Sequence, residues 1–557
     1  METNMSSRAA RAFFEAVPQN PTVLITAGLL AIVTAAVYLL SPGSNRAPAL
    51  GETIPYFSNA YQYMTDMRSF LARAGKYLRS SSVVRFRLGP KKVYLVTKAS
   101  NMQVLFRTTA NVDTNIFFLM IQENLWASSK RDLDRFRNDP SGRLKNPAPG
   151  TEHIPAEKRY WAGLHHIFHE YLARTHESNA LAANFQRQFA ARLEERFPAG
   201  EWAAVRILEF VRADMTMAAT TTLAGPRMLG LNPNLLRELW DFDEIAASLV
   251  WGLPKWINRE AWKKRDRFNA SCVRYLEDGW KDFDWDGPAA SASWEPVWGS
   301  RYVRELVRWM RQCGFDKETM GGAMMILVIF GTNGNTIPIV AWCLIELVKD
   351  KDLLARVRAE IETTYVTDSA TGTRTIDPQA LVALPLFQSV FVEILRLHVS
   401  MNVTREAVGP ITLGGYEIEK GAVLQAPTEI SHFDEGVWGA PGHPAAEFWA
   451  ERHLQYVDAV DEKGQVTRTP QFSMTGRSND FFPFGGGVSI CPGRFFAKQE
   501  IMLTAAMLVS RFDIEFVEWT TLDGSPSDRP AQNDVRWSGG ASVPPDRDMK
   551  VRWRRRW

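Results

Sequence analysis

One cysteine, Cys491, lies in a sequence context that favours chemistry over simple packing. It follows three successive glycines in the segment FFPFGGGVSICPGRFFAKQE, residues 481–500. Glycines permit backbone paths that side chains forbid, and they allow a flat ligand to approach closely. Pro492 suits the first turn of a helix, because its missing N–H would be unpaired there anyway. The segment therefore predicts a thiol at a helix N-terminus, where the helix dipole and free amides lower a thiol's pKa.

Two other interpretations of this segment compete. A phosphate-binding loop would need a Lys-Ser/Thr pair after the glycines or a dinucleotide-binding spacing, and the segment has neither. A buried structural cysteine is the more common role of a single cysteine near a helix start. The segment as a whole, and other motifs along the chain, must decide between these interpretations.

The pattern Phe484-x-x-Gly487-x-x-x-Cys491-x-Gly493 resembles the haem-binding signature of the cytochrome P450 superfamily. The resemblance implies haem b (iron protoporphyrin IX) as the cofactor. It also implies that Cys491 is the axial thiolate ligand, with Phe484 packed beside the sulfur. Ser489 departs from the pattern, since many members carry there a basic residue that touches a haem propionate.

A second motif concerns charged residues that would support the site without taking part in chemistry. Glu393 and Arg396 are three residues apart in FVEILRLHV, hence on one face of a predicted helix. Taken alone they would be an ordinary surface ion pair. Arg452, in EFWAERHL, resembles the family's second arginine. The resemblance implies a buried structural triad of Glu393, Arg396 and Arg452.

Three further residues are candidates for binding the haem propionates. Arg405 occupies the usual place of a propionate-binding arginine. Trp161 and His165, four residues apart, resemble the family's Trp-x-x-x-Arg motif with histidine in place of arginine. Histidine can donate to a carboxylate. A core or surface role remains the alternative for His165.

The apolar segment 318–350 predicts a buried helix whose centre carries Asn335 and Thr336. Pro338 cannot bond the carbonyl of Gly334, so a local kink with a free carbonyl is expected. The resemblance implies that Thr336 lines the oxygen-binding groove and helps to relay protons. Asn335 stands where the family usually has an acid, and an amide has no proton of its own to deliver. Asn-Thr-Ile-Pro and Ile-Cys-Pro-Gly-Arg resemble the branch containing cholesterol 7α-hydroxylase, sterol 12α-hydroxylase and prostacyclin synthase.

The elements that would position these residues are mostly helices. Helical spacing dominates up to about residue 399, while residues 82–96 and 411–427 predict short strands. We expect a mainly α fold with small β-sheets and, from the resemblance, a cytochrome P450 fold with a single large catalytic domain, residues 61–557. The basic tail, residues 550–557, predicts a solvated end.

The N-terminal part predicts a membrane anchor. Residues 23–40 form an uncharged apolar run close to the ~20 residues that span a bilayer. A cleaved signal peptide would have a shorter apolar run and a shorter preceding segment than residues 1–22. A Pro/Gly-rich linker, residues 41–60, follows. The expected location is the endoplasmic reticulum membrane, single-pass, with the catalytic domain in the cytosol.

Composition narrows the possible partners. A net charge of +3, from 65 basic and 62 acidic residues, gives no reason to expect nucleic acid. The four cysteines contain no Cys-x-x-Cys unit, which argues against structural zinc and fits a reducing compartment. We expect three of them to be inert core residues.

The leading hypothesis is a haem-thiolate monooxygenase that hydroxylates a lipophilic small molecule, such as a steroid, terpenoid or other secondary metabolite. It would use O2 and electrons from an NADPH–cytochrome P450 reductase, because the sequence has no flavin or nicotinamide motif of its own. An isomerase or dehydratase acting on a peroxide without external electrons is the alternative, and Asn335 motivates it. A haem-binding sensor or carrier is a third possibility.

Overall fold

The computed structural model describes residues 46–107, 111–250, 252, 255–460 and 466–557. The predicted N-terminal segment (residues 1–22) and membrane anchor (residues 23–40) lie outside the described residues. The described chain divides into two compact units. The first contains the residues up to 113 together with 402–431, and the second contains residues 114–401 and 432–557.

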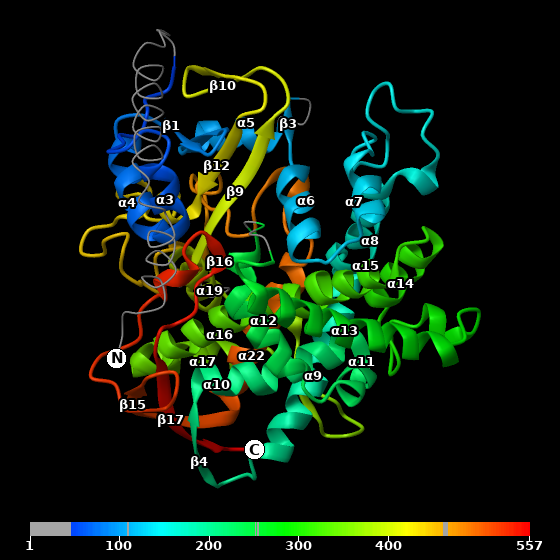
Figure 1. Cartoon of the computed structure of the whole chain (residues 1–557). Coiled ribbons are helices and arrows are strands. Elements are labelled where there is room, and N and C mark those ends of the chain that lie inside the picture. The colour runs from blue at the N-terminus through cyan, green and yellow to red at the C-terminus, as the bar shows by residue number, and fades with distance from the viewer. Residues whose placement is uncertain (1–45, 108–110, 251, 253–254, 461–465) are drawn as a thin grey trace. The chain divides into compact units, whose positions relative to one another are not determined.

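The first unit is built on a small sheet with strands in the order β1-β2-β12-β9 (Figure 1). The strands predicted within residues 82–96 are confirmed, since β1 and β2 pair antiparallel with Gly89 between them at φ +56°. β12 runs parallel to β2 and antiparallel to β9. The elements of this unit are α3 (Ser58–Thr65), α4 (Met67–Leu78), β1 (Val83–Leu88), β2 (Lys91–Val96), α5 (Ala99–Arg107), β3 (Val112–Asp113), the C-terminal part of β9 (Val399–Ala407), β10 (Ile411–Leu413), β11 (Tyr416–Ile418), β12 (Val423–Pro427) and α20 (Thr428–Ser431).

The second unit is mainly helical, which confirms the predicted mainly α composition. Its helices are α6 (Asn115–Asn124), α7 (Lys130–Arg137), α8 (Tyr160–Phe168), α9 (Thr175–Arg196), α10 (Ile207–Phe210), α11 (Thr216–Leu231), α12 (Leu235–Val250), α13 (Arg259–Asp282), α14 (Arg301–Gln312), α15 (Lys317–Ala323), α16 (Gly331–Lys349), α17 (Lys351–Glu362), α18 (Pro378–Leu381), α19 (Pro385–His398), α21 (Glu435–Trp438) and α22 (Arg494–Arg511).

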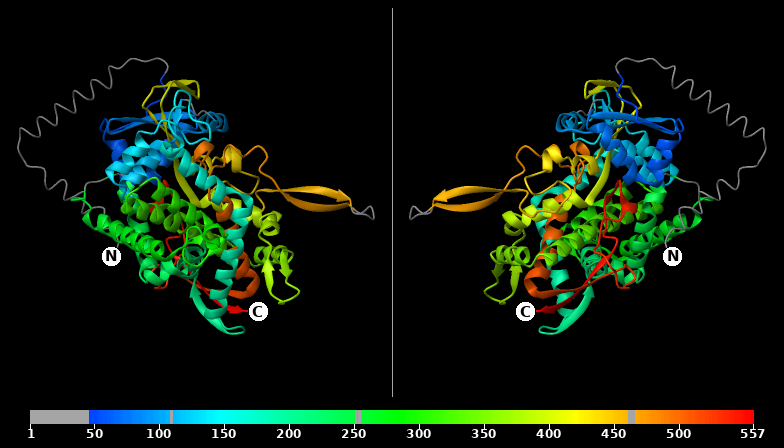
Figure 2. Two further views of the ribbon diagram at one scale, coloured as in Figure 1. Left: turned by 90° about the vertical axis from the view of Figure 1, so that its right-hand side faces the viewer. Right: turned by 90° about the vertical axis from the view of Figure 1, so that its left-hand side faces the viewer.

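The strands of the second unit form small sheets at its edges. They are β4 (Trp202–Arg206), β5 (Trp294–Glu295), β6 (Gly299–Ser300), β7 (Tyr365–Thr367), β8 (Arg374–Ile376), β13 (Leu454–Val460), β14 (Val466–Phe472), β15 (Phe512–Thr520), β16 (Gly540–Ser542) and β17 (Asp548–Arg555). The β13–β14 hairpin extends away from the helices of this unit (Figure 2). β16 pairs with the first three residues of β9.

The prediction of a solvated basic tail is wrong. β17 lies between β15 and β4 in a three-stranded sheet. Val551 and Trp553 point into the core, and Trp553 packs edge-on against Phe210 with ring centroids 4.7 Å apart. The intervening arginines face outward, and Arg554 pairs with Asp513 at 2.8 Å. The alternation of period two in this segment is a strand pattern, which the density of positive charge obscured.

The predicted buried helix is confirmed as a run from Lys317 to Lys349 that is largely buried. Within the described residues it is the one helix long and apolar enough to cross a membrane, and its burial identifies it as a core helix. Its departure from α-helical geometry is a π-helical segment, Met324–Phe330. α16 continues through Pro338, so the irregular turn precedes the predicted position.

Candidate active site

The loop before α22 curls so that the backbone of Cys491 is anchored within the loop itself. The Cys491 N–H donates to the carbonyl of Phe484 at 2.9 Å. Gly485 and Gly487 have φ values of +73° and +66°, a conformation that favours glycine. α22 begins at Arg494, three residues after the cysteine. The predicted position of Cys491 just ahead of a helix is therefore confirmed.

The electrostatics at the Cys491 sulfur differ from the prediction. Burial raises the pKa of the thiol, whereas the backbone amides of Gly493 and Arg494 and the charge of Arg494 lower it. The effect of burial is larger than that of these groups, so the prediction of a lowered pKa for the Cys491 thiol is wrong. Loss of solvation penalises the anion more than two amides and one guanidinium can offset.

The other cysteines lack these amide donors. Cys272 and Cys343 are buried, and burial raises the pKa of Cys343 to about 12. Cys313 is partly exposed, and burial raises its pKa to about 11. Of the four cysteines, only Cys491 has backbone amides that lower the pKa of its thiol.

The donor set at Cys491 fits a haem. In the part of the chain that the structure describes, no group of three or more His, Cys, Asp or Glu side chains could hold a metal ion directly. Haem iron would need a single thiolate from the protein, since the macrocycle would supply its nitrogen ligands. Amide donors at the sulfur stabilise such a thiolate.

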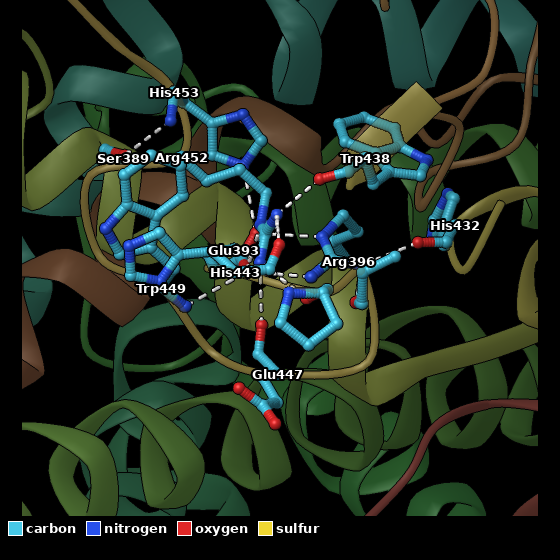
Figure 3. A network of polar contacts seen from close by, with 12 residues as sticks. Ser389, Glu393, Arg396, His432, Trp438, His443, Glu447, Trp449, Arg452 and His453 are labelled. Carbon is cyan, nitrogen blue, oxygen red and sulfur yellow. Dashed lines mark hydrogen bonds and ion pairs between the residues drawn. The ribbon is translucent and has the colours of Figure 1, made fainter. Parts of the chain in front are cut away.

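The predicted charged triad is assembled by residues from α19 and from the segment after α21 (Figure 3). The side chains of Glu393, Arg396 and Arg452 are each 0% exposed. Arg396 binds both carboxylate oxygens of Glu393, at 2.7 and 2.8 Å, and Arg452 Nε donates to one of them at 2.8 Å. The two arginines are thus bound to one shared carboxylate, the arrangement that the family resemblance implies.

The remaining donors of the two arginines bind backbone carbonyls, which links the triad to the surrounding loop. Arg396 donates to the carbonyls of His432 and Ala445 at 2.7 and 2.6 Å. Arg452 donates to the carbonyls of Trp438, His443, Pro444 and Glu447. A buried charge requires this degree of pairing and hydrogen bonding.

His453 is a fourth member of this network that the sequence analysis missed. Its Nε2 lies 3.2 Å from Glu393 Oε2. Burial alone would raise the pKa of Glu393, but hydrogen bonds from Arg396 and His453 prevail and lower it to about 2. The position of His453 directly after Arg452 was the available signal.

Thr336 and Asn335 lie on neighbouring positions of α16 but differ in their surroundings. Thr336 is 4% exposed, and its hydroxyl donates to the carbonyl of Thr332 at 2.6 Å. Asn335 is exposed, and its side-chain oxygen accepts from the backbone N–H of Ser542 at 3.3 Å. Glu500, on α22, is a buried acid beside Thr336 that the sequence analysis missed.

Trp161 and His165 both lie on α8. Trp161 is buried, and its indole N–H donates to the carbonyl of Phe136 at 2.8 Å. Burial and the nearby charge of Arg143 lower the pKa of His165. The Arg143 guanidinium lies 4.7 Å from the centre of the Trp161 ring. The sequence analysis did not single out Arg143, because the loop before α8 separates it from Trp161 and His165.

Arg405 belongs to the first unit, on β9. It is 5% exposed, and its Nη1 donates to the carbonyl of Thr404 at 2.8 Å. The structure therefore places Arg405 in a buried position within its own unit.

A helical body, a cysteine with amide donors ahead of a helix, and a glutamate clamped by two arginines are together typical of the haem-thiolate enzymes. The sequence model of the family described as "Cytochrome P450" matches residues 312–528. This range includes the central helix, the Glu393 network and the Cys491 loop.

Comparison with characterised proteins supports the same assignment over nearly the whole chain. The "Cytochrome P450 monooxygenase calL" of Penicillium decumbens is 45% identical over 537 residues, covering 96% of this chain and 98% of that protein. The "Cytochrome P450 monooxygenase efuG" of Hormonema carpetanum is 27% identical, with 93% and 91% coverage. The "Cholesterol 7-alpha-monooxygenase" of Cricetulus griseus is 26% identical over 51% of this chain and 53% of its own length. The chain belongs to the cytochrome P450 family and is a monooxygenase.

Proposed function

We propose that this enzyme hydroxylates a lipophilic small molecule, a steroid, terpenoid or other secondary metabolite. It would use O2 and electrons passed from NADPH by a cytochrome P450 reductase. The observation that carries the proposal is the Cys491 loop, where two backbone amides act on a sulfur at the start of α22. A haem bound there would supply the oxygen chemistry, because a thiolate ligand favours O–O cleavage.

In this proposal the haem is held by residues of the Cys491 loop and by polar side chains from other segments of the chain. Cys491 binds the iron, Phe484 packs beside the sulfur, and Gly487 and Gly493 allow close approach. The propionate-binding residues would be Arg405 and His165. Trp161 would contribute its ring to the site, since its N–H already donates to Phe136.

On the oxygen side, the proposed roles belong to Thr336 and Asn335. Thr336 would pass a proton through its hydroxyl, and Asn335 would orient this part of α16 through its bond to Ser542. Glu393, Arg396 and Arg452 would have a structural role, holding the segment that leads into the Cys491 loop.

The proposal includes a location at the endoplasmic reticulum membrane, with the catalytic domain (residues 61–557) in the cytosol behind the anchor. A lipophilic substrate would partition into such a membrane. The similarity to a protein named for cholesterol supports a steroid or related terpenoid as the first class to test.

The test of the haem assignment is the reduced carbon monoxide spectrum. We expect the strongly red-shifted Soret band of a thiolate-bound haem in the parent protein, and its loss in Cys491→Ala. Cys313→Ala is the matched control, because Cys313 is also partly exposed. A band that persists in Cys491→Ala would overturn the assignment. A spectral screen of steroids, terpenoids and alkaloids would then define the substrate class.

A second candidate function is a peroxide isomerase or dehydratase, which Asn335 favours because such chemistry needs no delivered proton. The two functions differ in their need for electrons. Turnover of a bound compound that requires NADPH and reductase supports the monooxygenase, whereas turnover of an organic peroxide without them supports the isomerase.

A further inference from the structure

A cavity in the second unit is lined by α10, by the π-helical turn Val211–Met215 that follows it, and by the start of α12. The end of β4 and the start of β17 complete its walls, and Figure 1 shows α10, β4 and β17 next to one another. The cavity volume is about 260 Å³, a little below the ~300–1,000 Å³ that is typical of small-molecule sites. It therefore suits a compact ligand.

Two acidic residues line the cavity, and both are already paired. The Asp548 carboxylate accepts from the backbone N–H groups of Leu208 and Glu209 at 2.8 and 3.0 Å. The Glu209 side chain pairs with Arg206 at 2.6 Å. Groups of the protein itself therefore satisfy the negative charges of the cavity.

Two arginines of the cavity, Arg212 and Arg237, have no such partner. Within the described residues, neither side chain forms an ion pair, and the buried Nε of Arg212 has no hydrogen-bond partner. The Arg212 guanidinium lies over the Trp240 ring, 5.0 Å from its centre. The Trp240 N–H donates to the Arg212 carbonyl at 3.1 Å, which holds the ring beside this guanidinium. Arg212 is thus held in place while its hydrogen-bond donors stay unused.

One further acid, Asp243, acts on Arg212 without lining the cavity. Burial raises the pKa of Asp243 to about 7, and the charge of Arg212 opposes this shift. A carboxyl that titrates near neutral pH offsets the charge of Arg212 only in part. The cavity therefore retains positive charge after its own acids are paired.

The rest of the lining is apolar and comes from Leu208, Ala213, Leu236 and Leu522. Leu522, in the turn after β15, is 40% exposed, so part of this apolar surface is open to solvent. Burial of such surface by a ligand is favourable in proportion to the area removed from water. The cavity thus combines unused cationic donors with an apolar wall.

We propose that this cavity is a binding site for a small apolar carboxylate, whose carboxylate binds Arg212 and whose apolar part packs against the leucines of the wall. A guanidinium binds a carboxylate through two parallel N–H···O bonds. Arg237 adds a second positive charge. A doubly charged phosphate fits less well, because Glu209 and Asp548 would repel its second charge. The site lies outside the residues proposed for the haem and does not depend on the proposed reaction.

The test compares 1-naphthoate with its uncharged analogue 1-naphthamide, using the haem-loaded full chain and isothermal titration calorimetry. We expect one naphthoate to bind per chain. Naphthamide should bind more weakly by roughly tenfold or more, because it cannot form charge-assisted hydrogen bonds with a guanidinium. No binding of naphthoate at millimolar concentrations, or equal affinities of the two compounds, would overturn the proposal.

Two variants then locate the bound naphthoate. Arg212→Met removes the guanidinium and should weaken binding by roughly tenfold or more. Leu522→Glu leaves Arg212 in place and adds a like charge at an exposed position, so it should also weaken binding without disturbing the fold. Arg356→Met is the matched control, because Arg356 pairs with Glu451 and does not line the cavity. It should bind like the parent, and parent affinity in either cavity variant would overturn the proposal.

The visible spectrum of the same samples separates this site from the haem. Naphthoate bound in the cavity should leave the Soret band unchanged. A Soret shift that is half-saturated at the calorimetric Kd would mean that naphthoate binds at the haem, and it would overturn the proposal. Because binding is measured without NADPH or reductase, failure of the monooxygenase reaction would leave this result intact.

Discussion

Two glutamates of the second unit, Glu393 and Glu500, are both 0% exposed and yet are held in opposite states. Glu393 is clamped by two arginines and a histidine, and its pKa is lowered to about 2. Glu500 faces a hydroxyl and apolar surroundings, and its pKa is raised. Burial acts on both carboxyls in the same direction, so the partners alone decide between a structural anion and a neutral acid.

The clamped glutamate should be the more costly of the two to change. Glu393→Gln leaves the buried Arg396 and Arg452 without their anion. We expect it to lower the free energy of unfolding by about 3–5 kcal/mol, the usual cost of breaking a buried ion pair. Denaturant unfolding of the haem-loaded protein measures this.

Glu447→Gln is the matched control for that variant. Its side chain is exposed, and only its backbone carbonyl bonds Arg452. It should unfold like the parent. Equal stabilities of Glu393→Gln and Glu447→Gln would mean that the network does not hold this region.

Protonation of Glu393 at low pH should destabilise the protein in the same way as the Glu393→Gln substitution. Its folded pKa of about 2 lies below the ordinary 4.5, so the stability that it contributes is present above pH 4.5 and lost as pH falls toward 2. Between pH 4.5 and pH 2 the free energy of unfolding should fall by about 3 kcal/mol. The difference in unfolding free energy between the parent and Glu393→Gln should shrink between pH 5 and pH 3. A constant difference would contradict the pairing.

A more conservative change should test the geometry of the clamp and not its charge. Arg396→Lys keeps the positive charge but loses the fork that binds both oxygens of Glu393. We expect a loss of about 2 kcal/mol, in the range for hydrogen bonds to charged groups. Arg356→Lys, at the exposed pair with Glu451, should cost less than about 1 kcal/mol. Thermal unfolding of both variants makes the comparison.

The two glutamates also show what the sequence can reveal. The pairing of Glu393 with Arg396 was predictable because they are three residues apart on one helix, whereas its burial and its bond to Arg452 were expected from the family resemblance. Glu500 was not predictable, because its neighbours on α22 are largely apolar and its partner Thr336 is on another helix. A pattern along one element can indicate a pair within it, but the approach of two distant helices is fixed only by packing.

The same distinction applies to the fold and to the Cys491 loop. Helical spacing predicted the mainly α body, the glycines predicted the loop, and Pro492 predicted a helix start close to the observed one at Arg494. The pKa of Cys491 was not predictable, since it depends on how deeply the folded chain buries the sulfur. The tail was predicted wrongly because its outward arginines masked the inward Val551 and Trp553.

The last effect on stability concerns Glu500 itself, and its sign is opposite to that of Glu393. Below pH 4.5 the Glu500 carboxyl is neutral in both the folded and unfolded states and contributes nothing. Above it the unfolded chain releases a proton that the folded protein retains. Stability therefore falls with rising pH, by up to about 1.4 kcal/mol per pH unit until the folded pKa is reached.

Glu500→Gln removes this dependence, because an amide does not titrate. The variant should gain stability relative to the parent between pH 5 and pH 7, measured as unfolding midpoints at each pH. Glu393→Gln should show no such gain, since its anion is already paired. A parent and a Glu500→Gln variant whose difference stays constant over this range would mean that Glu500 is ionised in the fold. The contrast in protonation state between the two glutamates would then be lost, because both would be anions.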